Sequence, residues 1–114
     1  MQDYLLVMTK VETLFFRLYP VFKRFPKSEK YSLTARIKEA FYDIICHLST
    51  GSSVPSRRFV EYQLADANIK KLKFMLKTAY KQKYFSNSNY EETDLEMTEI
   101  AKMVSAMIKT VKKS

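Results

Sequence analysis

The chain has 114 residues, with one glycine, three prolines and a formal charge of +8 at pH 7. That length suits one domain with a real core and is too short for two. Because strands need turn residues about every 8–12 positions, the scarcity of glycine argues against a β-rich fold and for an all-α protein. The charge favours an anionic partner, which leaves nucleic acid, acidic proteins and anionic lipids.

Apolar residues recur at spacings of three and four from Tyr4 to Phe25, which predicts a first helix over about residues 3–24. A second apolar stripe on the same helix holds Phe15, Tyr19 and Phe22. Two stripes indicate either a helix at the centre of a bundle or half of a contact between subunits. We favour the subunit contact.

The segment FPKSEKY at 25–31 ends the first helix, because proline disfavours helix at the residue before it. Ser32 is expected to cap a second helix, over about residues 33–49, with its hydroxyl group. Gly51 is placed to close that helix. The Gly/Ser/Pro-rich stretch at 50–56 then leads to the third helix.

The third predicted helix, over about residues 56–84, concentrates the charge of the chain. Residues 57–83 hold eight cations and two anions, which is +6 of the net +8. At about 100° per residue, an apolar stripe from Tyr62 to Ala79 lies opposite a lysine face. That lysine face consists of Lys70, Lys73, Lys77 and Lys81.

Two interpretations of the lysine face remain open. It could contact phosphates, which gives salt-dependent binding with little sequence preference. Alternatively, the lysines only solvate the outer surface, with Asp66 pairing Lys70 one turn away. Phe74 lies inside the lysine sector, so a monomer would expose its ring. We expect this ring either to stack on a base or to enter a neighbouring subunit.

SNSNYEET at 86–93 predicts the last connection, and Thr93 with Glu96 makes a capping box for a fourth helix over about residues 91–112. Four amphipathic helices with short connections predict an up-down-up-down four-helix bundle, with residues 1–114 as one domain. The different apolar surfaces of the first and third helices also predict a cyclic oligomer, because a heterologous contact that closes gives a ring.

The sequence offers no set of residues that suits catalysis. His47, the only histidine, follows Cys46, the only cysteine, and adjacent side chains diverge on a helix. Glycine-rich phosphate loops and cysteine clusters are missing. We therefore expect no enzyme activity, no cofactor and no metal. With an unpaired cysteine and no visible export or membrane segment, we expect a cytoplasmic protein without membrane contact.

Three segments resemble a known family. They are LYPVFKRFPKSEKYSLTARIKEAF at 18–41, YQLADANIKKLKFMLKTAY at 62–80 and EIAKMVSAMI at 99–108. They are similar to the accessory variability determinant (Avd) proteins of diversity-generating retroelements. More distantly, they resemble the four-helix proteins encoded in intervening sequences of bacterial 23S ribosomal RNA genes. Asp66-Ala67 and Leu72-Lys73-Phe74 are typical of the retroelement branch.

The resemblance implies a pentameric barrel of four-helix subunits that binds nucleic acid, RNA or DNA, and the retroelement's reverse transcriptase. Such a protein would support mutagenic cDNA synthesis without doing chemistry itself. Lys73 and Lys77 match basic positions of the family, and Arg36 matches a position that is frequently basic. The alternatives are a protein of the ribosomal intervening-sequence type, or an interaction scaffold without a nucleic-acid role.

Charge pattern and resemblance together give two predicted sets of residues. The predicted nucleic-acid contacts are Arg36, Arg57, Arg58, Lys70, Lys73, Lys77 and Lys81. The predicted contacts of the homo-oligomer are Phe15, Tyr19, Phe22 and Phe74.

Overall fold

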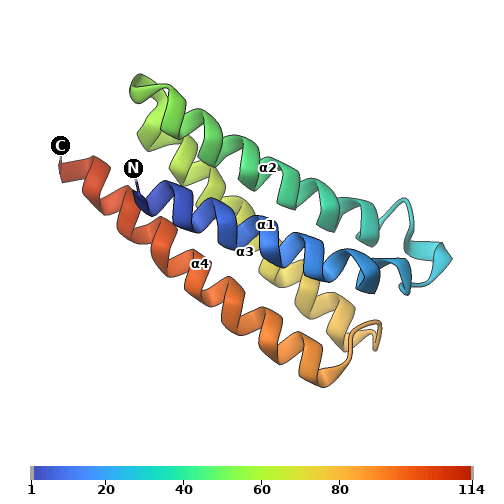
Figure 1. The fold of residues 1–114 in the computed structure, drawn as a ribbon. Helices are drawn as coiled ribbons and strands as arrows, with labels where there is room; N and C mark the ends of the chain where they lie inside the picture. Colours follow the sequence, from blue (N-terminus) through green and yellow to red (C-terminus); the bar gives the residue numbers. More distant parts are fainter. Residues whose placement is uncertain (1, 114) are drawn as a thin grey trace.

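The computed structural model describes residues 2–113, and the side chains of residues 4–112. Its four helices are α1 (Gln2–Lys23), α2 (Leu33–Ser53), α3 (Arg58–Lys81) and α4 (Asn87–Lys113). Two short 3₁₀ turns, η1 (Lys27–Glu29) and η2 (Pro55–Arg57), precede α2 and α3. The helices run up-down-up-down, and no strand occurs among residues 2–113 (Figure 1). The predicted all-α four-helix bundle is confirmed.

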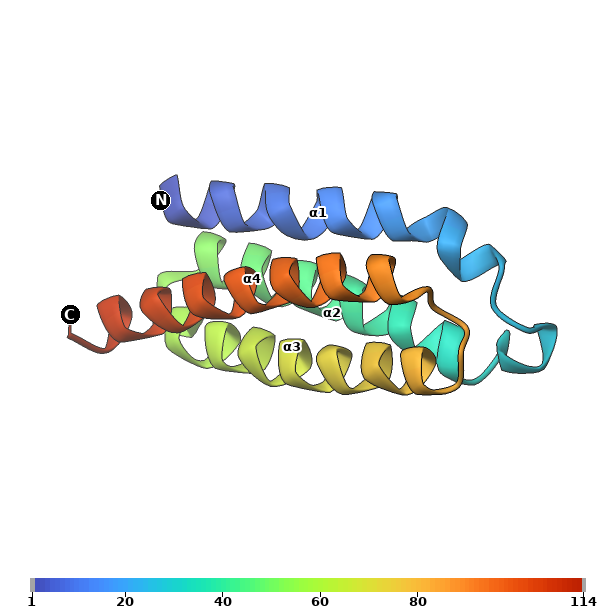
Figure 2. The same cartoon turned by 90° about the horizontal axis from the view of Figure 1, so that it is seen from below.

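The connections between the helices lie at the two ends of the bundle. The connections at 24–32 and 82–86 lie at one end, which we call the loop end (Figures 1 and 2). The α2–α3 turn lies at the other end, with the start of α1 and the end of α4. The most extensive contact between helices is the one between α2 and α3.

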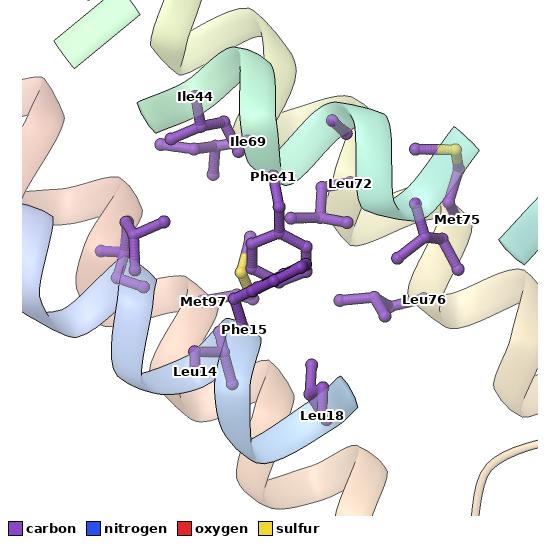
Figure 3. Close-up of a cluster of buried hydrophobic side chains, with 14 of the residues drawn as sticks. Leu14, Phe15, Leu18, Phe41, Ile44, Ile69, Leu72, Met75, Leu76 and Met97 are labelled. Carbon is purple, nitrogen blue, oxygen red and sulfur yellow. The ribbon is translucent and has the colours of Figure 1, made fainter. Parts of the chain in front are cut away.

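The core is built from the stripes that the sequence pattern predicts. Phe41 of α2 is fully buried at its centre, and its ring faces α1, α3 and α4 side chains (Figure 3). Leu14 and Leu18 approach from α1, and Leu72 and Met97 approach from α3 and α4. At about 25 cal/mol for each Å² of apolar surface removed from water, these contacts supply most of the driving force for folding.

Phe15 and Phe22 belong to this core. Their predicted role in a subunit contact is wrong, because other helices of the same chain bury them. They are 6% and 2% exposed, and the Phe15 ring packs against Phe41 with centroids 5.2 Å apart. Tyr19 is half-buried, with the Nζ atoms of Lys38 and Lys23 at 4.5 and 5.7 Å from its ring centroid. The second stripe therefore reflects the position of α1 against α2.

Helix α2 continues one turn beyond its predicted end at residue 49, and Gly51 lies inside the helix instead of closing it. A Cβ atom at Gly51 would be 2.6 Å from Cε1 of Tyr62, which is closer than real Cβ contacts. The missing side chain lets α2 and α3 pack closely where they meet. Glycine at this position serves close helix packing rather than helix termination.

Helix starts also differ from the capping predictions. At α2, the Ser32 hydroxyl donates to Glu29 Oε1 at 2.6 Å, and Glu29 itself accepts the Leu33 N–H at 3.4 Å. Helix α4 begins at Asn87, and Ser86 Oγ accepts the Asn89 N–H at 3.2 Å. The predicted capping box of Thr93 and Glu96 is therefore wrong.

Thr93 lies inside α4 and is fully buried, where its hydroxyl oxygen accepts a hydrogen bond from Arg17 Nη2 at 3.1 Å. The same guanidinium group pairs with Glu96 at 2.7 Å. These two residues therefore join α4 to α1. They do not cap a helix end.

Helix α3 ends earlier than predicted, through a motif that has no glycine. Lys83 has a φ of 66°, the Lys83 N–H donates to Tyr80 O, and the Tyr84 N–H donates to Ala79 O, both at 2.9 Å. This is the Schellman pattern, in which the left-handed position usually holds glycine. Because this position holds a lysine, no glycine marks the helix end in the sequence.

Candidate nucleic-acid interface

The two-sided character of α3 is confirmed. Its apolar stripe is buried against the other helices, and Ala65, Ile69, Leu72 and Ala79 are fully buried. On the opposite side, Lys70, Lys77 and Lys81 are exposed. Lys73 lies at the edge and is partly buried. The lysine face is therefore a real surface, but its four members differ in what they contact.

Two lysines of this face are already paired with groups of the chain. Lys70 Nζ lies 3.1 Å from Asp66 Oδ2 one turn away, as predicted, while 77% of the Lys70 side chain stays exposed. Lys73 turns toward α4, where its Nζ donates to Thr98 Oγ1 at 2.9 Å and lies 3.7 Å from Asp94. Lys73 is thus mainly an interhelical contact, and Lys70 is partly neutralised.

The other two lysines point to solvent without a counter-charge. Lys77 and Lys81 are exposed and have no hydrogen-bond or ion-pair partner among the residues that the structure describes. Lys83 follows them in the exposed turn toward α4. The uncompensated charge of α3 is therefore concentrated in its C-terminal half, next to the loop end.

Arg57 and Arg58 hold the other end of the molecule together. The Arg58 guanidinium donates to the carbonyl oxygens of Gly51 and Ser52, both at 2.8 Å, and so satisfies groups at the C-terminus of α2. Arg57 donates two hydrogen bonds to Glu61 Oε2, at 2.6 and 3.1 Å. Both guanidinium groups therefore have partners within the chain, and the contact of Arg57 and Arg58 with nucleic acid stays a prediction.

Glu61 and His47 form a pair that sequence reasoning missed. The Glu61 side chain is only 6% exposed, and its Oε1 lies 2.8 Å from His47 Nδ1. The hydrogen bonds from His47 and from Arg57 hold the pKa of the Glu61 carboxyl group below its ordinary value. The sequence does contain a sign of this pair. Glu61 lies beside Tyr62 on the buried side of α3, and a buried carboxylate requires partners.

Arg36 lies on a separate surface, in an open hollow of about 460 Å³ between α2 and α3. The hollow also contains Lys71 and the acidic side chains Glu39 and Asp43. Because acidic and basic groups are mixed there, it has no clear preference for anions. Arg36 is exposed, but the structure does not bring it into one row with Lys77 and Lys81.

Exposed apolar side chains extend well beyond Phe74, which is 69% exposed as predicted. Phe16 of α1 and Leu95 of α4 are 68% and 73% exposed, and Leu5 and Leu6 lie further along α1. On α1 the sequence pattern predicted a surface stripe at Phe15, Tyr19 and Phe22, whereas the exposed apolar residues there are Leu5, Leu6 and Phe16.

Some kinds of site are not found. Among the described residues, no group of three or more His, Cys, Asp and Glu side chains is placed to hold a metal ion. None of the described helices has the apolar length that crossing a bilayer requires.

The fold and this surface define a class: a basic all-α bundle with an uncompensated cationic patch on one helix. A family model described as bAvd-like matches residues 5–111, nearly the whole chain. The chain therefore belongs to the bAvd-like family. This agrees with the resemblance to Avd proteins found in the sequence.

A solved structure gives the fold independent support. It is a protein of unknown function from the S23 ribosomal protein family of Bacteroides thetaiotaomicron, with a TM-score of 0.82 and 18% sequence identity. The match covers 94% of this chain and 98% of that chain. At this identity the likeness concerns the fold alone. No curated protein sequence matches the chain significantly.

Proposed function

We propose that this protein is a non-enzymatic accessory protein of a diversity-generating retroelement, which binds nucleic acid and the element's reverse transcriptase in the cytoplasm. Membership of the bAvd-like family supports the retroelement role. The observation that carries nucleic-acid binding is the pair Lys77 and Lys81, exposed and without a partner among the described residues. Cations of this kind release counterions when they meet phosphates.

The proposed nucleic-acid partner is the template RNA or its cDNA. Lysines on a regular helix contact the phosphate backbone and carry no base-specific information, so the expected binding has little sequence preference. Phe74 lies one turn before Lys77 on α3 and is 69% exposed. Its ring is available to stack on a base or to contact a protein partner.

We further propose that the chain functions as a homo-oligomer, with five subunits as the expected number. Phe16, Phe74 and Leu95 lie on three different helices, and a monomer leaves all three in water. Large exposed apolar residues on several faces suit contacts between copies. Light scattering is expected to give a mass well above that of the 13.5 kDa chain. A stable monomer at micromolar concentration would contradict this.

A second candidate function is a protein-interaction scaffold, or a protein of the ribosomal intervening-sequence type, in which the lysines only solvate α3. The pairing of Lys70 and Lys73 with carboxylates favours this alternative for half of the lysine face. The neighbouring genes discriminate between the candidates. A reverse-transcriptase gene with a template repeat supports the retroelement role, and a location inside a ribosomal RNA gene supports the alternative.

The direct test of nucleic-acid binding replaces the two partnerless lysines in a Lys77→Gln/Lys81→Gln variant. Lys102→Gln/Lys109→Gln on α4 is the matched control, since both of those lysines are also exposed. We expect the α3 variant to bind single-stranded RNA more weakly, and its salt slope to fall by about 0.7 for each phosphate that is no longer neutralised. Equal affinities and slopes for the wild type and both variants would refute the proposal.

A further inference from the structure

A second basic surface lies at the loop end, around the first turn of α2. Between residues 23 and 38 the chain carries six cations and a single carboxylate, Glu29. A hollow of about 220 Å³ opens here, and four lysines line it: Lys23, Lys27, Lys30 and Lys38. Among the residues that the structure describes, no Asp or Glu lines this hollow.

The one carboxylate of this segment is occupied elsewhere. Glu29 Oε1 accepts the Ser32 hydroxyl at 2.6 Å, and Oε2 accepts the Tyr84 hydroxyl at 3.0 Å. These bonds keep the pKa of Glu29 below its ordinary value. Glu29 therefore holds the connection in place and does not neutralise the lysines around the hollow.

Two of the four lysines, Lys23 and Lys38, lie against one aromatic ring. The Nζ atoms of Lys23 and Lys38 both lie over the ring of Tyr19, at 5.7 and 4.5 Å from its centroid. Such a ring attracts both ammonium groups, but it gives them much less than a full counter-charge. A bound anion would relieve the repulsion between them.

Thr34 supplies an independent sign of a ligand. This residue lines the same hollow and is only 7% exposed. Its Oγ1 is the single buried side-chain nitrogen or oxygen without a hydrogen-bond partner among the described residues. Buried hydroxyl groups are almost always satisfied, and leaving one unpaired is costly. Less than 1 Å² of this oxygen is accessible, so a phosphate oxygen becomes its acceptor once the Thr34 side chain rotates about its Cα–Cβ bond toward the hollow.

The size and walls of the hollow limit what it accepts. At about 220 Å³ it is smaller than pockets for drug-sized ligands, which span about 300–1,000 Å³. Phe22 and Phe25 form part of its wall, and they exclude water from one side of a bound group. The hollow therefore has room for a phosphate group.

We infer that this hollow, with its four lysines and the Thr34 hydroxyl, is a phosphate-binding site. In the assembled protein the phosphate is expected to belong to the bound nucleic acid, and this part rests on the proposed function. Neither Lys77 nor Lys81 lines the hollow, so the two sets of lysines can be substituted independently.

The first test uses inorganic phosphate as the probe and thermal unfolding as the readout. Because phosphate stabilises many proteins non-specifically, each variant is compared with the wild type in phosphate and in chloride at equal ionic strength and pH. We expect the specific rise in melting temperature to disappear in Lys27→Gln/Lys30→Gln and to shrink in the isosteric Thr34→Val. It should persist in Lys102→Gln/Lys109→Gln.

Titration of the phosphate resonance by ³¹P NMR measures the affinity directly. Removing one charged hydrogen-bond donor is expected to weaken phosphate binding about tenfold. If phosphate stabilises the wild type and Lys27→Gln/Lys30→Gln equally, the site does not exist. Should Thr34→Val fail to fold, the lysine variant, which changes only exposed side chains, still decides the question.

The second test identifies the source of the phosphate with two RNA oligonucleotides of one sequence, carrying a 5′-phosphate or a 5′-hydroxyl group. A terminal phosphate predicts about tenfold tighter binding of the phosphorylated form, and this preference should vanish in Lys27→Gln/Lys30→Gln. An internal phosphodiester predicts equal binding of both, weakened in the same variant. Unchanged RNA binding, together with abolished phosphate binding, assigns the site to free phosphate and overturns its link to nucleic acid.

The α3 variant separates this inference from the proposed function. If Lys77→Gln/Lys81→Gln weakens RNA binding and the Lys27→Gln/Lys30→Gln variant changes neither RNA nor phosphate binding, the inference fails and the proposed function stands. If no variant alters RNA binding, the proposed function fails, and only the phosphate titration supports the site.

Discussion

Gly51→Ala gives a sharp test of how α2 and α3 meet. In a helix interior this change normally stabilises a protein by about 0.5–1 kcal/mol, because alanine is the better helix former. Here the new Cβ would lie 2.6 and 2.8 Å from two atoms of the Tyr62 ring and 3.2 Å from the Glu61 Cβ. The Tyr62 ring is buried and cannot swing away without leaving the core.

Overpacking of this kind typically costs about 1–3 kcal/mol, which exceeds the gain in helix propensity. We therefore expect a net loss of about 1–2 kcal/mol and a fall in melting temperature of roughly 4–10 °C. Unfolding is followed by circular dichroism at 222 nm in urea and on heating. Protein concentration is held constant, because oligomer formation would make the melting temperature depend on it.

The matched control places the same change in a Tyr62→Leu background. Leucine lacks the ring atoms that the new Cβ would meet, so the cost of Gly51→Ala should become much smaller there. If Gly51→Ala instead stabilises the wild-type chain by the amount expected from helix propensity, α2 and α3 do not approach as closely as the structure shows. The explanation of why α2 continues past residue 49 would then be wrong.

Three further predictions concern helix ends and pH. Lys83→Gly should raise the free energy of unfolding by about 1 kcal/mol, because a lysine at a φ of 66° is disfavoured and glycine is not; a loss of stability in urea would contradict the Schellman end. Ser86→Ala should cost about 1 kcal/mol by removing the α4 cap, and an unchanged urea midpoint would refute that role. The pKa of Glu61 in the folded protein is lower than its ordinary value of 4.5. The Glu61 carboxylate therefore stabilises the fold above pH 4.5, and this stabilisation is lost as pH falls through the folded-state pKa. Acid unfolding of Glu61→Gln should therefore depend less steeply on pH below about 4.5 than that of the wild type, and identical profiles would show that the pair with His47 does not stabilise the fold.

Hydrophobic periodicity predicted the fold well, because the core contacts follow the helical repeat directly. The stripe that contains Ile69 and Leu72 on α3 is buried as expected, and Val104 on the amphipathic helix α4 is buried as well. Periodicity cannot tell which neighbour covers a stripe. Phe15 and Phe22 were therefore assigned to a second subunit, although α2 of the same chain covers them.

Helix ends were predicted less well because they depend on backbone conformation and on distant partners. Gly51 resembled a helix terminator, but its role depends on Tyr62, which lies in another helix. Thr93 and Glu96 matched a capping box, yet Arg17 of α1 uses both side chains. No local pattern encodes these long-range contacts.

The candidate site was predicted in outline only. Charge pattern located the cationic side of α3, but it could not distinguish Lys73, which pairs with α4, from Lys77, which has no partner among the described residues. The charge pattern also could not show that Arg58 is occupied, because the carbonyl groups that it binds lie at the end of α2. Which cations remain available to a ligand is a property of the packed bundle.

The most direct test of the central claim is a lysine footprint of the protein with and without RNA, read by acetylation and mass spectrometry. Binding through the C-terminal half of α3 predicts strong protection of Lys77 and Lys81 and little protection of Lys102 and Lys109. Equal acetylation of Lys77 and Lys81 in the presence and absence of bound RNA would contradict the assignment of this surface to nucleic acid.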